Sequence, residues 1–355
     1  MSENTLNLMS LFAGAGGLDK GFSSLEGFEV KWANEYDKKI WSTYRANFPE
    51  TQLDTRSIVD IEPNDIPFEV DGIIGGPPCQ SWSEAGASRG IEDHRGQLFY
   101  EYLRLLEAKK PLFFLAENVS GILFQKHSPA LTGILENFSR LGYNVSYGLL
   151  NASDYGVPQD RQRVIIVGYQ STTRKFFTPP EPVEKINRKT LRDALWDLKD
   201  TAVAAEGGTF ANASLEVPNH EYLVMGFSPI FMSRNRVRSW DEPSFTIQAG
   251  ARHAPLHPQA PKMIKVSKDV CAFAPGEESR YRRLTVREAA RVQTFPDDHT
   301  FVYSNVSDGY KMIGNAVPVT FAHALAEKIR TDLRGEIKQS GNIPPGEIKH
   351  FSELT

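Results

Sequence analysis

Residues 6–18 read Leu-Asn-Leu-Met-Ser-Leu-Phe-Ala-Gly-Ala-Gly-Gly-Leu, an apolar run that ends in a cluster of three glycines. Leu6–Phe12 is typical of a buried strand, and Leu18–Leu25 can form a helix directly after the turn. Glycines let the backbone approach a ligand closely, and the first N–H groups of a helix are free to bind one. This order predicts a nucleotide-type ligand site on an α/β sheet.

Working outward, short apolar runs alternate with helical stretches through the first half of the chain. We predict strands at Phe28–Ala33, Gly72–Gly75, Leu112–Glu117 and Val164–Gly168, and helices at Leu98–Lys109 and Ala130–Leu141. Strands connected through helices require right-handed crossovers. The predicted fold class is therefore α/β, with a doubly wound, mostly parallel sheet.

The sequence pattern changes after about residue 185, where the regular hydrophobic periodicity is lost and Pro, Gly, Asn and Arg are frequent. This change predicts a smaller, irregular, β-rich domain over residues 186–300. Residues 1–185 and 301–334 are then the larger domain, completed by an amphipathic helix at Phe321–Leu333. Residues 335–355 are expected to be a poorly packed tail.

The composition is that of an ordinary globular protein, with 40% hydrophobic and 24% charged residues among 355. No apolar run reaches the roughly 18 residues that span a membrane, and the N-terminus lacks a secretory signal pattern. Two cysteines, Cys79 and Cys271, are too few for a disulfide framework or a thiolate zinc site. The eight histidines show no ligand spacing, so we expect no metal, and we expect a reducing, cytoplasmic setting.

The charge distribution says more than the net charge of −4. Residues 1–185 hold 18 Lys and Arg against 24 Asp and Glu, whereas residues 225–300 hold 12 against 8. A nucleic-acid partner would be held by such a local basic face, because charges beyond a Debye length are screened.

Three groups of polar residues stand at predicted strand ends. Glu35 lies 18 residues after Gly17, where an acid can hold a ribose diol. The glycine spacing is not G-x-G-x-x-G, so a pyrophosphate is not the expected ligand, and a tight turn without a ligand is the alternative. Glu117 closes another strand and can act as a proton donor at the same edge of the sheet. Arg161 and Arg163 alternate before a further strand, where they can bind phosphate or a polar substrate edge, or be surface charges.

A cysteine loop, Gly75-Gly-Pro-Pro-Cys-Gln-Ser-Trp-Ser83, directly follows one predicted strand. The prolines fix Cys79 at the carboxyl edge of the sheet, where doubly wound folds bind ligands. A free thiol has a pKa of about 8.5, so the site must activate Cys79 if it is a nucleophile. Cys271, between apolar residues, is expected to be a core or loop residue.

Taken together, these motifs resemble the DNA cytosine-5 methyltransferase family over about residues 6–330, in the family's order. The matching segments are Phe12–Leu18, Asn34–Asp37, Pro77–Gln80, Glu117–Val119, Gln159–Arg163, Arg282–Arg291 with Phe295-Pro296, and Gly314–Pro318. One position departs from the family pattern, because Ser57-Ile58 replaces the usual Asp-Ile pair. We favour Ile58 for stacking on the adenine and leave the hydrogen-bond partner of the adenine open.

The resemblance implies S-adenosyl-L-methionine as methyl donor and a target cytosine flipped out of double-stranded DNA. It implies catalytic roles for Cys79, Glu117, Arg161 and Arg163. It implies cofactor binding by Phe12, Ala13, Gly14, Gly16, Gly17, Leu18, Glu35, Ile58, Pro77, Leu98, Asn315 and Ala316. Cys79 would add to C6 of the cytosine while Glu117 contacts N3.

The arginine-rich segment resembles HaeIII-type, GGCC-specific methyltransferases of restriction–modification systems. Arginine reads guanine through O6 and N7, although it contacts phosphates more often than bases. The residues expected on DNA are Gln80, Ser83, Arg234, Arg236, Arg238 and Arg252. The resemblance implies methylation of the inner cytosine of GGCC, which protects host DNA from a cognate restriction endonuclease. We expect the enzyme to act as a monomer, without a stable protein partner and without a membrane.

Three other readings remain open at this stage. A thiol-dependent oxidoreductase with a dinucleotide is disfavoured by the glycine spacing and by the lack of a second cysteine near Cys79. A non-catalytic DNA-binding module is disfavoured by the joint presence of Cys79, Glu117, Arg161 and Arg163. An RNA cytosine-5 methyltransferase of similar fold is disfavoured by the arginine-rich segment.

Overall fold

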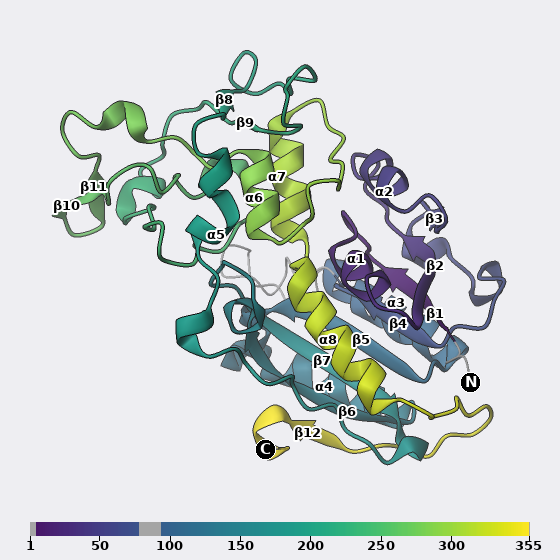
Figure 1. Ribbon diagram of the computed structural model, residues 1–355. Coiled ribbons are helices and arrows are strands. Elements are labelled where there is room, and N and C mark those ends of the chain that lie inside the picture. The colour runs from purple at the N-terminus through teal and green to yellow at the C-terminus, as the bar shows by residue number, and fades with distance from the viewer. Residues whose placement is uncertain (1–4, 78–93, 355) are drawn as a thin grey trace.

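One large sheet organises the part of the chain that the computed structural model describes, residues 5–77 and 94–354 (Figure 1). Its eight strands follow the order β12-β6-β7-β5-β4-β1-β2-β3. Their bounds are β1 (Leu6–Leu11), β2 (Phe28–Asn34), β3 (Gln52–Asp54), β4 (Gly72–Gly75), β5 (Phe113–Val119), β6 (Tyr143–Asn151), β7 (Gln162–Gln170) and β12 (Ile348–His350). Only β7 runs antiparallel to its neighbours, β5 and β6. The predicted mostly parallel sheet is confirmed, although β3, β6 and β12 were not foreseen.

The position of β1 creates the ligand crevice. This strand pairs in parallel with β2 on one side and with β4 on the other. The connections that leave the carboxyl ends of β1 and β4 therefore diverge, and doubly wound sheets bind ligands at such a switch point. The glycine turn follows β1, and the cysteine loop follows β4.

Helices cover both faces of the sheet, because residues along each strand alternate between two apolar layers. Leu8 and Phe113 pack with Phe321 in the layer under α1 and α8, whereas Met9 and Phe114 belong to the layer under α3 and α4. Burying one such side chain contributes roughly 1.5–3 kcal/mol. The bounds are α1 (Gly17–Ser23), α2 (Trp41–Asn47), α3 (His94–Lys109), α4 (Ser128–Arg140) and α8 (Val319–Asp332).

A smaller body stands beyond the carboxyl edge of the sheet, at the upper left of Figure 1. It holds α5 (Leu191–Leu195), α6 (Val286–Val292) and α7 (Val306–Asn315), with the short strand pairs β8 (Val203–Ala204) and β9 (Glu221–Tyr222), and β10 (Ile264–Ser267) and β11 (Val270–Ala272). Its apolar cluster joins Leu195 of α5, Ala289 of α6 and Ile313 of α7. The packing thus places α7 with the smaller body, although the division at residue 300 itself stays a prediction.

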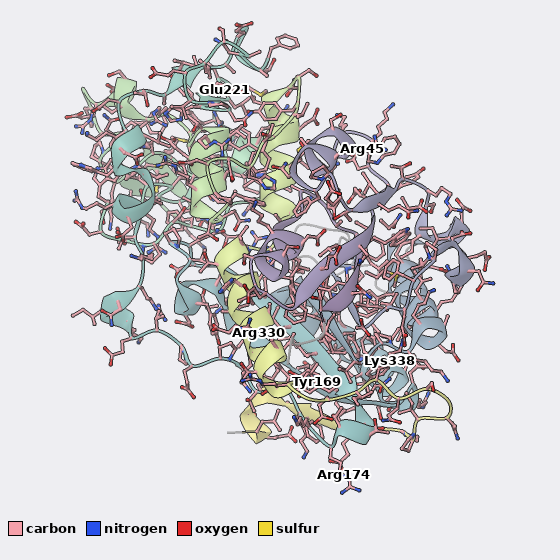
Figure 2. All side chains as sticks on the ribbon, turned by 45° about the vertical axis from the view of Figure 1, so that its right-hand side comes forward. Arg45, Tyr169, Arg174, Glu221, Arg330 and Lys338 are labelled. Atoms are coloured by element: carbon pink, nitrogen blue, oxygen red, sulfur yellow. The ribbon has the colours of Figure 1, made fainter. Side chains whose placement is uncertain are left out.

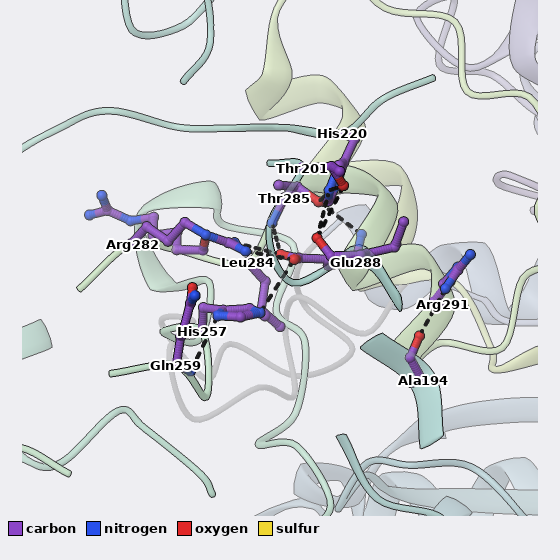
Figure 3. Close-up of polar contacts among 12 residues, drawn as sticks. Ala194, Thr201, His220, His257, Gln259, Arg282, Leu284, Thr285, Glu288 and Arg291 are labelled. Carbon is purple, nitrogen blue, oxygen red and sulfur yellow. Dashed lines mark hydrogen bonds and ion pairs between the residues drawn. The ribbon is translucent and has the colours of Figure 1, made fainter. Parts of the chain in front are cut away.

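The buried carboxylate of Glu288 lies at the centre of a set of polar contacts in the smaller body (Figure 3). Glu288 accepts hydrogen bonds from Arg282 at 2.7 and 2.8 Å and from the backbone N–H of Thr285 at 2.8 Å. Burial alone would raise the pKa of Glu288, but Arg282 holds it below its usual value. His257 lies 3.5 Å away, and burial lowers its pKa to about 4, so it is neutral at pH 7.

The C-terminal segment corrects one expectation. Most side chains of residues 335–354 are exposed, but the segment is anchored on the sheet: β12 pairs in parallel with β6, and Ile343 and Phe351 are buried. Lys338 donates to the carbonyl of Val70 at 3.0 Å (Figure 2). A three-residue strand is too short to show a period-2 pattern, which explains the wrong expectation. None of the described helices combines the length and apolar character needed to cross a membrane.

Candidate active site and DNA-reading surface

A cavity of about 470 Å³ opens at the carboxyl edge of β1, β2, β4 and β5, against the end of α7. Its volume lies within the roughly 300–1,000 Å³ typical of small-molecule sites. The structure brings almost all predicted cofactor and catalytic residues to its wall: Phe12, Ala13, Gly14, Gly17, Leu18, Glu35, Ile58, Pro77, Leu98, Glu117, Arg161, Arg163, Asn315 and Ala316. Gly16 is the predicted cofactor residue, among those described, that does not line it.

The glycine turn is a left-handed bend with separate tasks for its residues. Phe12, Gly14 and Gly16 have φ values of 55°, 57° and 80°. At Gly16 an added Cβ would meet the ring of Phe48 at 2.1 Å, so this glycine serves packing beneath the turn. At Gly17 it would meet the carbonyl of Val317 at 2.2 Å. The last two glycines therefore allow close packing, and Gly14 presents its backbone to the cavity.

Glu35 closes the turn from the end of β2. Its carboxylate accepts the N–H of Gly14 at 2.9 Å and the N–H of Asp37 at 2.7 Å. Burial raises the pKa of Glu35, and these two hydrogen bonds oppose that rise. Each carboxylate oxygen keeps lone pairs for a further donor, such as a sugar hydroxyl.

Two ion pairs that sequence reasoning missed join the segment after β2 to α7. Lys311 contacts Asp37 at 2.7 Å, and Lys39 contacts Asp308 at 2.8 Å. Asp37 and Lys311 line the cavity, as does the exposed ring of Tyr36. Partners more than 250 residues apart give no local sequence signal.

The catalytic candidates Glu117 and Arg163 form a direct pair. Arg163 Nε lies 2.7 Å from Glu117 Oε1, and both side chains are about nine-tenths buried. Gly76 lies beside them, since a Cβ there would be 3.1 Å from Glu117 Oε2. The cavity therefore contains a fixed carboxylate with a guanidinium behind it.

Arg161 is placed differently from Arg163. Its side chain is fully buried, with Nη1 donating to the carbonyl of Ile247 and Nη2 donating to the carbonyls of Gly314 and Ala316, all at 2.9 Å. The sequence grouped the two arginines as ligand-binding residues. In the structure, Arg161 joins the carboxyl end of α7, at the cavity wall, to the backbone of Ile247.

The predicted nucleophile Cys79, together with Gln80 and Ser83, lies outside the described residues. The chain can be followed to Pro77, which lines the cavity and accepts a hydrogen bond from Asn118 Nδ2 at 3.4 Å. Pro77 is two positions before Cys79, so the cysteine loop starts at the cavity wall beside Glu117.

At the predicted adenine end, Ile58 is buried and lines the cavity together with Ser57. Asp60 is exposed and is not part of the cavity wall. Ser57 therefore places a polar side chain beside Ile58 at this end of the cavity.

The four arginines expected on DNA fall into two pairs. Arg236 donates to the carbonyls of Phe231 and Ile230 at 2.8 and 2.9 Å, and Arg238 contacts Asp160 at 3.1 Å. The other pair is exposed, and no hydrogen bond or ion pair engages either side chain among the described residues: Arg234 and Arg252. Arg238 also stacks on Phe245, with its guanidinium carbon 4.3 Å from the ring centre.

Neither a transition-metal nor a calcium-type site emerges from residues 5–77 and 94–354, where no three His, Cys, Asp or Glu side chains gather. The sheet topology, the glycine turn with its acid and the cavity at the switch point define a methyltransferase of the S-adenosylmethionine-dependent class. Residues 6–331 match the C-5 cytosine-specific DNA methylases, and the chain belongs to that family.

Curated relatives and a solved structure agree with this assignment. The chain is 53% identical over 332 residues to the Type II methyltransferase M.NgoPII of Neisseria gonorrhoeae, covering 93% of this chain and 97% of the relative. It is 53% identical over 330 residues to M.MthTI of Methanothermobacter thermautotrophicus, covering 93% and 98%. The fold also matches that of Entamoeba histolytica methyltransferase EhMeth, with a TM-score of 0.66, 18% identity and coverage of 93% and 99%. The protein is thus a DNA cytosine-5 methyltransferase whose methyl donor is S-adenosylmethionine.

Proposed function

We propose that this enzyme methylates the inner cytosine of GGCC in duplex DNA and so protects host DNA from a cognate restriction endonuclease. The observation that carries the proposed chemistry is the Glu117–Arg163 pair in the wall of the cavity, next to Pro77 and hence to the start of the Cys79 loop. The target GGCC rests on the resemblance of the arginine-rich segment to HaeIII-type methyltransferases. Relatives that are about half identical carry the name Type II methyltransferase. Action as a monomer in the cytoplasm, without a stable protein partner, belongs to the same proposal.

The cavity fits S-adenosylmethionine in the chemistry of its donors. Glu35 offers a carboxylate to a ribose diol, and Gly14 brings the backbone close without a side chain. Ile58 supplies an apolar face and Ser57 a polar group at the proposed adenine end, and Asn315 and Ala316 also line the cavity. The bound cofactor would supply the methyl group.

Cytosine C6 becomes electrophilic when the N3 edge receives a proton or a strong hydrogen bond. Glu117 is held to provide that contact, and Arg163 fixes the orientation of its carboxyl group. The thiolate of Cys79 then adds to C6, and its electron pair forms the S–C6 bond. The displaced π electrons of the C5=C6 bond make C5 nucleophilic. After C5 is methylated, water takes the C5 proton, the proton held at N3 returns to Glu117, and the thiolate departs, which restores the aromatic base.

The ribose role of Glu35 gives a first prediction. Glu35→Ala should weaken S-adenosylmethionine binding about tenfold or more, because it removes hydrogen bonds to a charged group, each worth about 1.5–3 kcal/mol. Isothermal titration calorimetry measures the Kd. Glu29→Ala, an exposed acid on the same strand, is the control and should bind normally. Equal dissociation constants for the two variants would remove Glu35 from the cofactor site.

The exposed arginines, Arg234 and Arg252, are the strongest candidates for contacting guanine. Among the described residues nothing engages the guanidinium groups of Arg234 and Arg252, whereas the guanidinium of Arg238 is paired with two carboxylates, Asp160 and Glu242. Arg236 keeps one nitrogen, Nη1, beyond its two backbone contacts and can still reach a base edge. The proposal therefore retains all four positions and assigns the direct contacts first to Arg234 and Arg252.

Alanine at Arg252 or Arg234 should lower kcat/KM on GGCC, by a factor that corresponds to about 1–3 kcal/mol of activation free energy. The preference for GGCC over sites with one altered guanine should decrease as well. Methylation rates on duplexes that differ at a single base pair measure this discrimination. Arg140→Ala, on α4 at the far face of the sheet, should leave it unchanged. A uniform loss on every duplex, with the salt slope reduced by about one, would instead assign the arginine to a phosphate.

A further inference from the structure

Two buried glutamines lie between the cavity and the smaller body. Gln159 precedes β7, Gln293 follows α6, and both side chains are fully buried. Gln159 Nε2 donates to Gln293 Oε1 at 2.8 Å. Gln293 Nε2 in turn donates to the carbonyls of Ile313 and Ala316 at 2.7 and 3.1 Å. One end of this glutamine pair therefore holds the carboxyl end of α7, which forms a wall of the cavity.

The other end of the glutamine pair holds segment 247–249, which leads back to the arginine-rich segment. Gln159 Oε1 accepts the N–H of Ile247 at 2.8 Å, and the carbonyl of the same residue accepts Arg161 Nη1 at 2.9 Å. The two backbones also touch, because a Cβ on Gly314 would lie 2.3 Å from the nitrogen of Ala249. Segment 247–249 and the carboxyl end of α7 with Ala316 (residues 313–316) thus cannot move independently without breaking buried hydrogen bonds.

The same contacts lead toward the arginine-rich segment. Ser244 donates its N–H to the carbonyl of Pro158 and accepts the N–H of Asp160, both at 2.9 Å. The carboxylate of Asp160 accepts a hydrogen bond from Arg238 at 3.1 Å. A continuous set of polar contacts therefore joins the arginine-rich segment to the wall of the cofactor cavity.

We propose that Gln159 and Gln293 are positioning residues that couple recognition of the target DNA to the affinity for the cofactor. This inference rests on the proposed function. Amide hydrogen bonds are directional, and a buried donor or acceptor left unpaired costs about 1–3 kcal/mol. A shift of segment 247–249 when DNA binds must therefore be matched by the carboxyl end of α7 and Ala316, which line the cavity. Because binding coupling is reciprocal, the cofactor must tighten DNA binding by the same factor.

Calorimetry with S-adenosylhomocysteine, which cannot transfer a methyl group, measures this coupling with and without a GGCC duplex. In the unchanged enzyme the duplex should tighten the Kd about tenfold, a usual size for coupled sites. Gln293→Met keeps the side-chain length, removes the amide and should reduce this factor to about twofold or less, and Gln159→Met should do the same. The double variant should add no further loss, since the two side chains act as one unit.

Gln170→Met is the matched control at the opposite end of β7. Its buried amide likewise donates to two backbone carbonyls, those of Lys110 and Gln339, but it lies away from the cavity. It should lower the melting temperature without changing the coupling factor. If Gln293→Met does not fold in a thermal melt, Gln159→Met gives the same reading.

An unchanged coupling factor in folded Gln293→Met or Gln159→Met overturns the inference, as does a factor of one in the unchanged enzyme that still methylates GGCC. An equal loss of coupling in Gln170→Met also overturns it, because the effect would then be general destabilisation. Failure of the proposed function would look different, since the unchanged enzyme would leave GGCC unmethylated.

Discussion

Glu117→Gln is expected to lower kcat by about 10²–10⁴-fold, the range that general acid catalysis contributes. Glutamine keeps the size of the side chain but cannot supply a proton to N3 of the cytosine. It also removes the negative charge that orients Arg163, whose Nε lies 2.7 Å from the carboxylate. Single-turnover methyl transfer at saturating DNA and cofactor measures the chemical step without the binding steps.

Glu101→Gln provides the control for this change. Glu101 pairs with Arg104 at the same 2.7 Å but on α3, and it does not line the cavity. Its substitution should leave kcat unchanged, and both variants should bind S-adenosylhomocysteine as tightly as the parent. A Glu117→Gln variant with parental kcat would mean that another group activates the base.

Cys79→Ser is expected to lower methyl transfer by at least about 10³-fold, as loss of a covalent nucleophile does elsewhere. A serine hydroxyl is far less acidic than a thiol and forms almost no anion at neutral pH. DNA binding should persist, because the arginines of the smaller body are untouched. A duplex with fluorine in place of hydrogen at the target C5 tests the same step. Release of the enzyme requires loss of the C5 hydrogen as a proton, and fluorine cannot be lost in this way. The parent should stay covalently attached to it, and the variant should not.

Cys271→Ser is the matched control, because the chain has two cysteines. Cys271 is buried in a second apolar cluster of the smaller body, with Phe231 and Tyr281, and does not line the cavity. This variant should lose some stability and keep its ability to form the covalent complex. A covalent complex in Cys79→Ser would exclude Cys79 as the nucleophile.

The local motifs of the site were predictable because each one is a short strand followed by residues with special chemistry. Gly14 and Glu35 follow β1 and β2, and both contact the same cavity. Their closeness follows from parallel strand order alone. The strand β6 escaped prediction because Asn144 and Ser146 are buried within it, which breaks the apolar run.

What the sequence could not supply is the division of labour among like residues. Arg161 and Arg163 sit two positions apart, yet one joins backbone segments and the other pairs with Glu117. The arginines of the smaller body divide in the same way: Asp160 engages Arg238, whereas Arg252 is exposed and has no partner within residues 5–77 and 94–354. These differences depend on partners distant in sequence, and no local pattern records them.

Bisulfite sequencing of unmethylated DNA treated with the purified enzyme and S-adenosylmethionine tests the central claim most directly. The account predicts that the inner cytosine of every GGCC resists conversion on both strands, while other cytosines convert and DNA treated with Cys79→Ser converts throughout. Protection at a different tetranucleotide would contradict the assigned target. Full conversion with the active, folded enzyme would contradict cytosine-5 methylation itself.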